Sequence, residues 1–331
     1  MNNSFQKRVV QLFCCLFFWP GWLHGAEGRI PALGDAHGTD QSYKLVWQEE
    51  FSGTKLDRKK WVAVDDPKIG QYGHGNGESQ AYLDAEGETF FIKDGRLTII
   101  AHHAPDAKYP LRDKPYGKFK RNIDHQDFKS AKLTTEKLRA FTYGIFEARI
   151  KNPTDARGQR TAIPVWPAFW LMPEAKTAPY SGYWDQAASK GKREWARSTW
   201  PYSGEIDIME MIGGNQTGRD DTTHGTIHWD PGNGLYAYSG DSKTLSSGIL
   251  ADEYHVYSIV WTPSQIAWYL DDDTIPYHVE NISSYGMSEF RAPFYFILNI
   301  AVGGNWPGYP DASTVFPQEM LVDYIRVFQQ Q

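Results

Sequence analysis

The sequence predicts an all-β fold of two stacked antiparallel sheets. Apolar and polar residues alternate with a period of two over several short runs, and these runs are rich in β-branched and aromatic residues. Gly, Pro, Asn or Asp bounds the runs, and helical periodicity is nearly absent. Sheets of this kind bury one face against each other, so the simplest architecture is a single domain spanning residues 44–331.

Five runs are expected to form strands: Phe141–Ile150, His255–Trp261, Ile266–Leu270, Phe294–Val302 and Leu321–Phe328. In the first run, Phe146, Ala148 and Ile150 fall on one face of the strand. The second and third runs are separated by Thr-Pro-Ser-Gln, which predicts a hairpin. The one helical candidate is Asp185–Ala196.

The first 26 residues predict an export signal. Lys7 and Arg8 precede an apolar run over residues 9–23, and small residues follow near a plausible cleavage point. The run is short for a membrane span, and no other stretch is long and apolar enough to cross a bilayer. Residues 27–43 are expected to form a flexible N-terminal lead. The sequence therefore predicts a secreted or periplasmic protein.

Both cysteines, Cys14 and Cys15, lie inside the predicted signal. A mature chain would have no thiol chemistry and no disulfide framework. A lipid anchor at Cys14 is an alternative, although Leu12 and Phe13 fit a lipid-attachment box poorly.

The chain is acidic, with 34 Lys and Arg against 40 Asp and Glu and a net charge of −6. Removing Lys7 and Arg8 leaves 32 against 40, a net charge of −8. Such a chain lacks the basic surface of nucleic-acid-binding proteins. It also argues against polyanionic substrates. We expect a monomer with no nucleic-acid partner and no membrane span.

One strand-like stretch carries three acids among apolar residues. Gly204-Glu-Ile-Asp-Ile-Met-Glu-Met-Ile212 contains Glu205, Asp207 and Glu210. An acid in a strand usually marks a solvated face, but the intervening isoleucines and methionines are equally unsuited to water. Three carboxylates in a strand buried on both sides indicate that they line a cavity.

The spacing of these acids predicts a kink. Glu205 and Asp207 share a face by the period of two, whereas Glu210 would fall on the opposite face of a regular strand. One extra residue at Ile208 or Met209 would form a β-bulge and return Glu210 to the same side. We therefore expect all three acids to point into one cleft.

Three close carboxyl groups suit two kinds of chemistry. Like-charge repulsion raises at least one pKa and creates a proton donor at neutral pH. A retaining glycosidase needs this combination of an ionised nucleophile and a protonated acid/base. A calcium or magnesium site is the alternative, because three carboxylates also suit hard cations.

Eight stretches, in order along residues 44–328 and including the acidic one, make the sequence similar to glycoside hydrolase family 16 and to its bacterial laminarinase-like members. They are Leu45–Gly53 with Leu56, Asp57 and Trp61, Gly75–Tyr82, Ser130–Thr135, Tyr143–Ile150, Trp166–Pro173, Ser203–Glu210, Gly225–Trp229 and Asn299–Gly308. The resemblance implies a β-jelly-roll sandwich of the concanavalin A-like lectin and glucanase type, with glucan held on one sheet.

The resemblance also implies roles for the three acids. Glu205 would be the nucleophile, Glu210 the acid/base and Asp207 the assisting carboxylate, in a reaction that retains the anomeric configuration. The six-residue E-x-D-x-x-E spacing is the bulged form found in laminarinases. No cofactor is expected to be required for catalysis.

Substrate-binding residues follow from the resemblance as well. Trp166 and Trp170 lie four apart on one strand face and would form a sugar platform, because apolar sugar faces stack on indole rings. Core packing is the alternative for each, since a β core would also explain an aromatic content of 15% with 13 Trp. The other expected contacts are Asn76, His228, Lys132, Glu78 and Trp306.

Each of these further contacts carries an alternative. Asn76 and His228 would otherwise satisfy buried backbone groups, and Glu78 and Trp306 would otherwise pack a loop. The family often has arginine at the position of Lys132. Lysine keeps the charge but loses the planar fork, so that contact departs from the family pattern.

Many relatives hold a structural calcium away from the cleft. The matching ligands here would be Glu50, the carbonyl of Gly95, and Asp323. Oxygen ligands of this kind suit calcium. A salt-bridge network without metal is the alternative.

The segment between Pro173 and Ser203, residues 174–202, is longer than the usual connection in the family and contains five large aromatic residues, Tyr180, Tyr183, Trp184, Trp195 and Trp200. Because it leads directly into the acidic strand, we expect it to form a rim of the cleft.

The leading functional hypothesis is a secreted endo-β-1,3-glucanase that also accepts mixed β-1,3/1,4-glucan. A relative acting on agar, porphyran or carrageenan, or a transglycosylase, is the second hypothesis. A non-catalytic β-glucan-binding protein is the third, but that class is expected to lose catalytic acids, and this chain keeps all three.

Overall fold

The computed structural model describes residues 43–69, 74, 76–104, 109–110, 125–126, 128–155, 164–174, 200–201, 203–214, 218–231, 236–310 and 314–331. All of them fall within one compact unit, Pro31–Gln331. The predicted signal, the predicted helix Asp185–Ala196 and nearly all of the predicted lead lie outside the described residues. They stay predictions.

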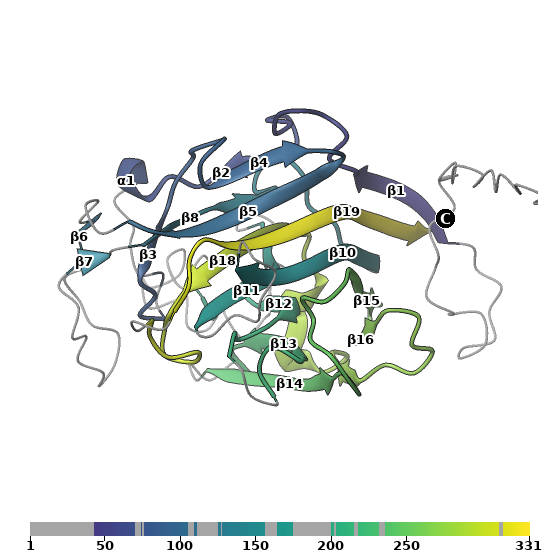
Figure 1. Ribbon diagram of the computed structural model, residues 1–331. Coiled ribbons are helices and arrows are strands. Elements are labelled where there is room, and N and C mark those ends of the chain that lie inside the picture. Colours follow the sequence, from purple (N-terminus) through teal and green to yellow (C-terminus); the bar gives the residue numbers. More distant parts are fainter. Residues whose placement is uncertain are drawn as a thin grey trace, which may run out of the picture. The chain divides into compact units, whose positions relative to one another are not determined.

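The first sheet has ten strands within the described part of the chain (Figure 1). Its order is β17 (His278–Asn281), β16 (Gln265–Leu270), β15 (His255–Trp261), β10 (Gly144–Asp155), β19 (Gln318–Gln330), β5 (Arg96–His103), β8 (Phe128–Ser130) and β3 (Gln80–Tyr82). In addition, β1 (Tyr43–Glu49) pairs with β19 and β4 (Phe90–Lys93) pairs with β5.

The second sheet has seven strands among the described residues. Its order is β14 (Ala237–Thr244), β13 (Thr222–Trp229), β12 (Glu205–Glu210), β11 (Val165–Pro173), β18 (Phe294–Val302), β9 (Lys132–Thr134) and β2 (Val62–Ala63). A separate pair joins β6 (Tyr109–Pro110) and β7 (His125–Gln126). The helical elements described are α1 (Asp66–Ile69) and the 3₁₀ segment η1 (Tyr285–Arg291). None of the helices described is long and apolar enough to cross a membrane.

The predicted strands are present with small changes at their ends. β15 and β18 match their predicted bounds, and the hairpin is confirmed because Trp261 pairs with Ile266. β10 begins at Gly144 rather than at Phe141. Tyr143 and Gly144 both have positive φ, and a Cβ on Gly144 would lie 2.3 Å from the Phe328 carbonyl oxygen. A regular strand cannot pass through such a step.

The two sheets bury a common core between them. Phe146, Ala148 and Ile150 are fully buried on the predicted face of β10, and they join one cluster with Leu298 of β18. Three tryptophans, Trp61, Trp261 and Trp268, are also fully buried. Because burying one large apolar side chain contributes about 1.5–3 kcal/mol, this cluster is the main stabilising element of the sandwich. Part of the aromatic content is therefore core, as one of the two interpretations expected.

Candidate active site

The predicted kink in the acidic strand is present. β12 lies between β11 and β13 in the seven-stranded sheet (Figure 1). Asp207 pairs with Thr226 and Glu210 pairs with His224, so three steps along β12 match two steps along β13. The register with β11 slips at the same place. One extra residue at Ile208 or Met209 forms a β-bulge and brings the third acid to the face of the first two.

The surroundings explain why the chain bulges here. Ile208 and Met209 are both buried in the core, which a regular alternation would not allow. The Nε1–H of Trp268, from the other sheet, donates to the carbonyl oxygen of Asp207 at 2.8 Å. Gly225 lies opposite the bulge, where a Cβ would come within 2.3 Å of the Trp268 ring. The missing side chain at Gly225 thus admits the indole that satisfies the displaced backbone.

Glu205 and Glu210 line one cavity of about 590 Å³ on the face of the sheet that points away from the core. Asp207 lies between them and is only 2% exposed. The Nε2 atom of His228 lies 3.0 Å from Asp207 Oδ2 and 3.8 Å from Glu205 Oε1. The Nε1–H of Trp166 donates to Glu210 Oε1 at 2.8 Å. Each acid therefore has a defined polar neighbour at this cavity.

The electrostatics of this cluster favour bound protons. Burial raises the pKa of Asp207 to about 8, and a hydrogen bond with Glu205 opposes that shift. Burial, together with the Asp207 carboxyl, raises the pKa of Glu210 to about 8. The same two causes raise the pKa of Glu205 above its usual range, while His228 acts in the opposite direction. At neutral pH the cluster as a whole therefore holds protons that a reaction can use, because burial and mutual repulsion disfavour the form in which all three carboxyl groups are charged.

The floor of the cavity continues over the two strands beyond β12. His224, Thr226 and His228 of β13 pair with Ser242, Gly240 and Tyr238 of β14, and all six residues line the cavity. They share one face because strand residues alternate with a period of two. His228 is thus part of the site and contacts carboxyl groups, rather than satisfying the buried backbone.

The other side of the cavity is formed by Trp166, Trp306 and Asn76. The Trp306 ring lies edge-on to Trp166, with centroids 5.3 Å apart, and edge-on to His224, with centroids 4.9 Å apart. The structure therefore places Trp166, Asn76 and Trp306 on the same cavity as Glu205 and Glu210, and their contact with sugar stays a prediction. Trp306 both packs its loop and lines the cavity.

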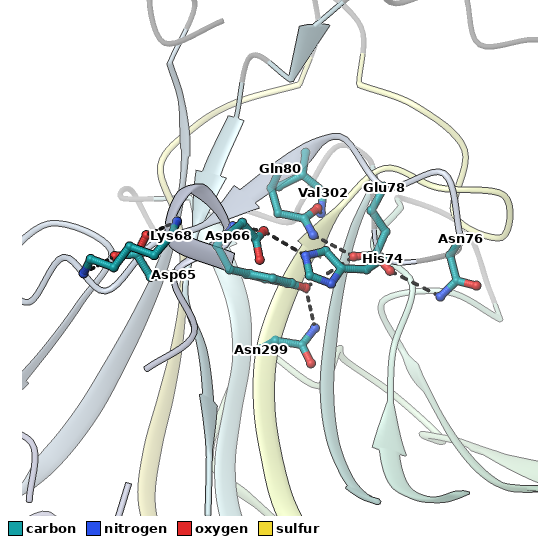
Figure 2. Close-up of polar contacts among 10 residues, drawn as sticks. Asp65, Asp66, Lys68, His74, Asn76, Glu78, Gln80, Asn299 and Val302 are labelled. Carbon is teal, nitrogen blue, oxygen red and sulfur yellow. Dashed lines mark hydrogen bonds and ion pairs between the residues drawn. The ribbon is translucent and has the colours of Figure 1, made fainter. Parts of the chain in front are cut away.

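Glu78 supports this wall from behind. It is only 6% exposed and does not line the cavity. Its carboxylate accepts hydrogen bonds from Asn76 Nδ2 at 3.2 Å and from Gln80 Nε2 at 2.6 Å (Figure 2). Gln80 in turn accepts from the backbone N–H of Val302 at 2.7 Å. Glu78 therefore fixes the position of Asn76, which reaches the cavity.

A second part of the same network anchors α1. Asp66 Oδ2 accepts from the backbone N–H of Tyr82 at 2.7 Å and lies 2.8 Å from His74 Nε2 (Figure 2). The Tyr82 hydroxyl contacts Glu78 Oε2 at 3.4 Å and Asn299 Nδ2 at 3.1 Å. Buried polar groups that are hydrogen-bonded to one another in this way hold a region in one arrangement.

Trp170 and Lys132 lie beyond the residues that line this cavity. The Trp170 Nε1–H donates to Asn299 Oδ1 at 2.7 Å, and the Lys132 ammonium lies 5.0 Å from the Trp170 ring centroid. Burial lowers the pKa of Lys132. These two residues share the face of the acids, on the opposite side of β12 from the cavity floor. Their part in sugar binding stays a prediction.

Sequence reasoning gave no role to several residues that line the cavity, namely His224 and Thr226 of β13, Tyr236, and Tyr238, Gly240, Asp241 and Ser242 of β14. His224 was accessible from sequence, because it lies four residues before His228 and shares its strand face. Trp200 lies near the end of the predicted insertion and lines the cavity. Residues 175–199 and 202 of that segment lie outside the described residues, so the rim as a whole stays a prediction. The position of Tyr236 and Tyr238 at the cavity follows from the pairing of β14 with β13, which no sequence pattern indicated.

The predicted calcium ligands belong to the other sheet, where Asp323 lies in β19 and Glu50 directly follows β1. Glu50 accepts two hydrogen bonds from Arg326, at 2.8 and 3.0 Å, and Asp323 accepts one from Arg149 at 2.6 Å. Gly95 lies between β4 and β5 with a φ of 71°. Both carboxylates are thus paired with guanidinium groups, as the salt-bridge alternative expects, and calcium would have to displace these pairs. Calcium binding stays a prediction.

The acidic cluster fits a hard cation less well than it fits proton chemistry. Donor atoms of Glu205, Asp207 and His228 lie within 4.8 Å of one another, which is close enough for a metal ion. However, calcium and magnesium prefer oxygen ligands, and here an imidazole and the indole N–H of Trp166 face the carboxyl oxygens. The arrangement favours carboxyl groups that exchange protons.

Comparison with known proteins supports a specific family. The family model described as "Glycosyl hydrolases family 16" matches residues 112–326. "Beta-glucanase" of Rhodothermus marinus is 32% identical over 305 residues, which is 88% of each chain. "Glucan endo-1,3-beta-glucosidase A1" of Niallia circulans is 33% identical over 304 residues, 87% of this chain but only 38% of that relative.

A solved structure shows the same architecture. The catalytic domain of an endo-1,3-beta-glucanase (laminarinase) from Thermotoga petrophila RKU-1 aligns with a TM-score of 0.65 at 31% identity. The match covers 88% of this chain and 99% of that one. The predicted β-jelly-roll sandwich is confirmed by this similarity and by the two observed sheets.

Proposed function

This chain belongs to glycosyl hydrolase family 16 and is a glycoside hydrolase, and we propose that it cleaves internal β-1,3 linkages of glucans such as laminarin by a retaining double displacement. Mixed β-1,3/1,4-glucan is a second expected substrate. The names of the relatives from Rhodothermus marinus, Niallia circulans and Thermotoga petrophila support glucan as the substrate class.

The observation that carries this proposal is the bulge in β12. It places Glu205 and Glu210 on one cavity although their spacing in a regular strand would separate them. A retaining mechanism requires two carboxyl groups on the same sugar-binding cavity, one on each side of the scissile bond. The bulge provides this pair from a single strand.

In the proposed first step, the Glu205 carboxylate attacks the anomeric carbon while protonated Glu210 donates its proton to the glycosidic oxygen. The C–O bond to the leaving sugar breaks, and a glycosyl ester forms on Glu205. In the second step, Glu210 takes a proton from water, the water attacks the anomeric carbon, and the ester bond to Glu205 breaks. Two inversions give a product with the original β configuration.

Asp207 is proposed to assist Glu205. It exchanges a hydrogen bond with that carboxyl and lies 3.0 Å from the His228 imidazole. A proton on Asp207 would stabilise the charge that returns to Glu205 when the ester is cleaved. His228 would hold Asp207 in place for that role.

The direct test is a digest of laminarin, lichenan and agarose in parallel, with the products sized and their anomeric form followed by NMR. We expect release of β-anomers from laminarin before mutarotation, weaker release from lichenan and none from agarose. First-formed α-anomers would overturn retention, and preferential release from agarose would overturn the substrate class.

The indole of Trp166 should lower the upper pH limit of activity, which burial of Glu210 and the neighbouring Asp207 raise. Its N–H donates to the Glu210 carboxylate, which stabilises the charged form and lowers the pKa of Glu210. Because the proposed acid must be protonated, kcat/KM should fall as pH rises through about 8. Trp166→Phe removes the donor, so the pKa of Glu210 should rise and the alkaline limb should move up by about one pH unit at most.

A pH profile of kcat/KM measures this shift, and Trp170→Phe is the matched control. The Trp170 N–H donates to Asn299 and not to an acid, so its loss should leave the position of the alkaline limb in place. An alkaline limb that stays fixed in Trp166→Phe, or moves down, would contradict the assignment.

A further inference from the structure

An exposed aromatic wall stands beside the acids. Trp200, Tyr236 and Tyr238 are 46%, 48% and 67% exposed, and all three line the cavity. A cluster of large aromatic side chains at the rim of a cavity is typical of a ligand-binding surface. Nothing in the proposed double displacement uses them.

The three rings form a continuous surface. The Trp200 and Tyr236 centroids lie 5.1 Å apart, and the Tyr236 and Tyr238 rings are stacked with centroids 5.9 Å apart and planes 22° from parallel. Tyr236 also stacks on His228, with planes 10° from parallel. Its hydroxyl lies 2.7 Å from His228 Nδ1. The wall is therefore held in place by a residue of the site.

The register fixes the position of the wall. Glu205 pairs with His228 across β12 and β13, and His228 pairs with Tyr238 across β13 and β14. Adjacent strands are about 4.8 Å apart, so the backbone at Tyr238 lies roughly 10 Å from that at Glu205. A sugar chain with its cleaved bond at the acids can reach the wall within a few units.

The chemistry of the site selects the ligand class. Aromatic rings bind the apolar C–H faces of pyranoses, and bases of single-stranded nucleic acids also stack on such rings. Four acids line or adjoin the same cavity, Glu205, Glu210 and Asp241 as lining residues and Asp207 beside them, and the chain carries a net charge of −6. These acids would repel the phosphate groups of a nucleic acid, and the lining residues include no groove of basic side chains that would bind its backbone.

We propose that Trp200, Tyr236 and Tyr238 form an additional sugar subsite that binds glucosyl units of a long β-glucan at a distance of one to a few units from the cleaved bond. This inference rests on the proposed function. If these three aromatic residues bind sugar, the enzyme should prefer long polymeric substrates over short ones.

Tyr238→Ala tests the subsite, because this ring is the most exposed of the three and makes no hydrogen bond that holds the catalytic cluster. We expect the ratio of kcat/KM for laminarin to kcat/KM for a short aryl laminarioside to fall about five- to tenfold, as one lost stacking contact predicts. Tyr238→Phe keeps the ring and should restore the ratio to within about twofold of wild type. Ile275→Ala, at a 78% exposed position outside the cavity, is the surface control.

The binding arm uses Glu205→Gln, which lacks the nucleophile, and measures laminarin-oligosaccharide affinity by calorimetry with and without Tyr238→Ala. Weaker binding in the double variant supports the subsite. An unchanged ratio, or an equal loss on both substrates, would overturn it. If wild type does not cleave laminarin but Tyr238→Ala still weakens oligosaccharide binding, the proposed function fails while the subsite stands.

Discussion

Replacing Glu205 with glycine is expected to lower kcat/KM on laminarin by about 10⁴- to 10⁶-fold, the range of losses seen when a nucleophile or its partner is removed. The reason is that the first displacement needs a carboxylate at this position to form the glycosyl ester. Initial rates on laminarin and on an aryl laminarioside measure the loss. Glu319→Gln, a glutamate in β19 of the other sheet, should keep wild-type kcat/KM.

Added azide separates a lost nucleophile from a damaged fold. In Glu205→Gly, azide can occupy the space of the missing carboxylate and attack the anomeric carbon of an aryl laminarioside with a good leaving group. One displacement inverts the centre, so the product should be an α-glycosyl azide. A β-glycosyl azide, or no rescue in a variant with a wild-type melting temperature, would contradict the role of Glu205.

The acidic strand shows how far sequence alone could reach. The period of two, with apolar residues between the acids, was sufficient to predict both the bulge and its place at Ile208 or Met209. The contact that stabilises the bulge could not be predicted, because it comes from Trp268 in the other sheet. Trp268 reaches the Asp207 carbonyl only where Gly225 leaves room, and the two residues are far apart in sequence.

Other parts of the site depend on long-range pairing in the same way. Glu78 matched a family motif, yet its function as a support for Asn76 follows from contacts that only the folded chain brings together. Tyr236 and Tyr238 become part of the site because β14 pairs with β13 in one register. A shift of that register by one residue would turn Tyr238 away from the cavity. Local patterns predict faces of strands, whereas neighbours across strands require the fold.

Replacing Glu210 with alanine is expected to lower kcat/KM on laminarin by about 10²- to 10⁴-fold, the usual contribution of a general acid. The loss should be much smaller on an aryl laminarioside with a good leaving group, because such a group departs without a proton. The alkaline limb of the pH profile, assigned to Glu210 with its pKa of about 8, should disappear with that substrate. Steady-state rates on the two substrates across pH measure both effects.

Azide again identifies the step that is impaired. In Glu210→Ala the glycosyl ester on Glu205 still forms from the activated substrate, but no base remains to activate water. Azide needs no base, so it should attack the ester and give a β-glycosyl azide after two inversions, the configuration opposite to that expected from Glu205→Gly. Equal losses on both substrates, or an α-glycosyl azide, would show that the two carboxyl groups on the bulged strand do not divide the work in this way.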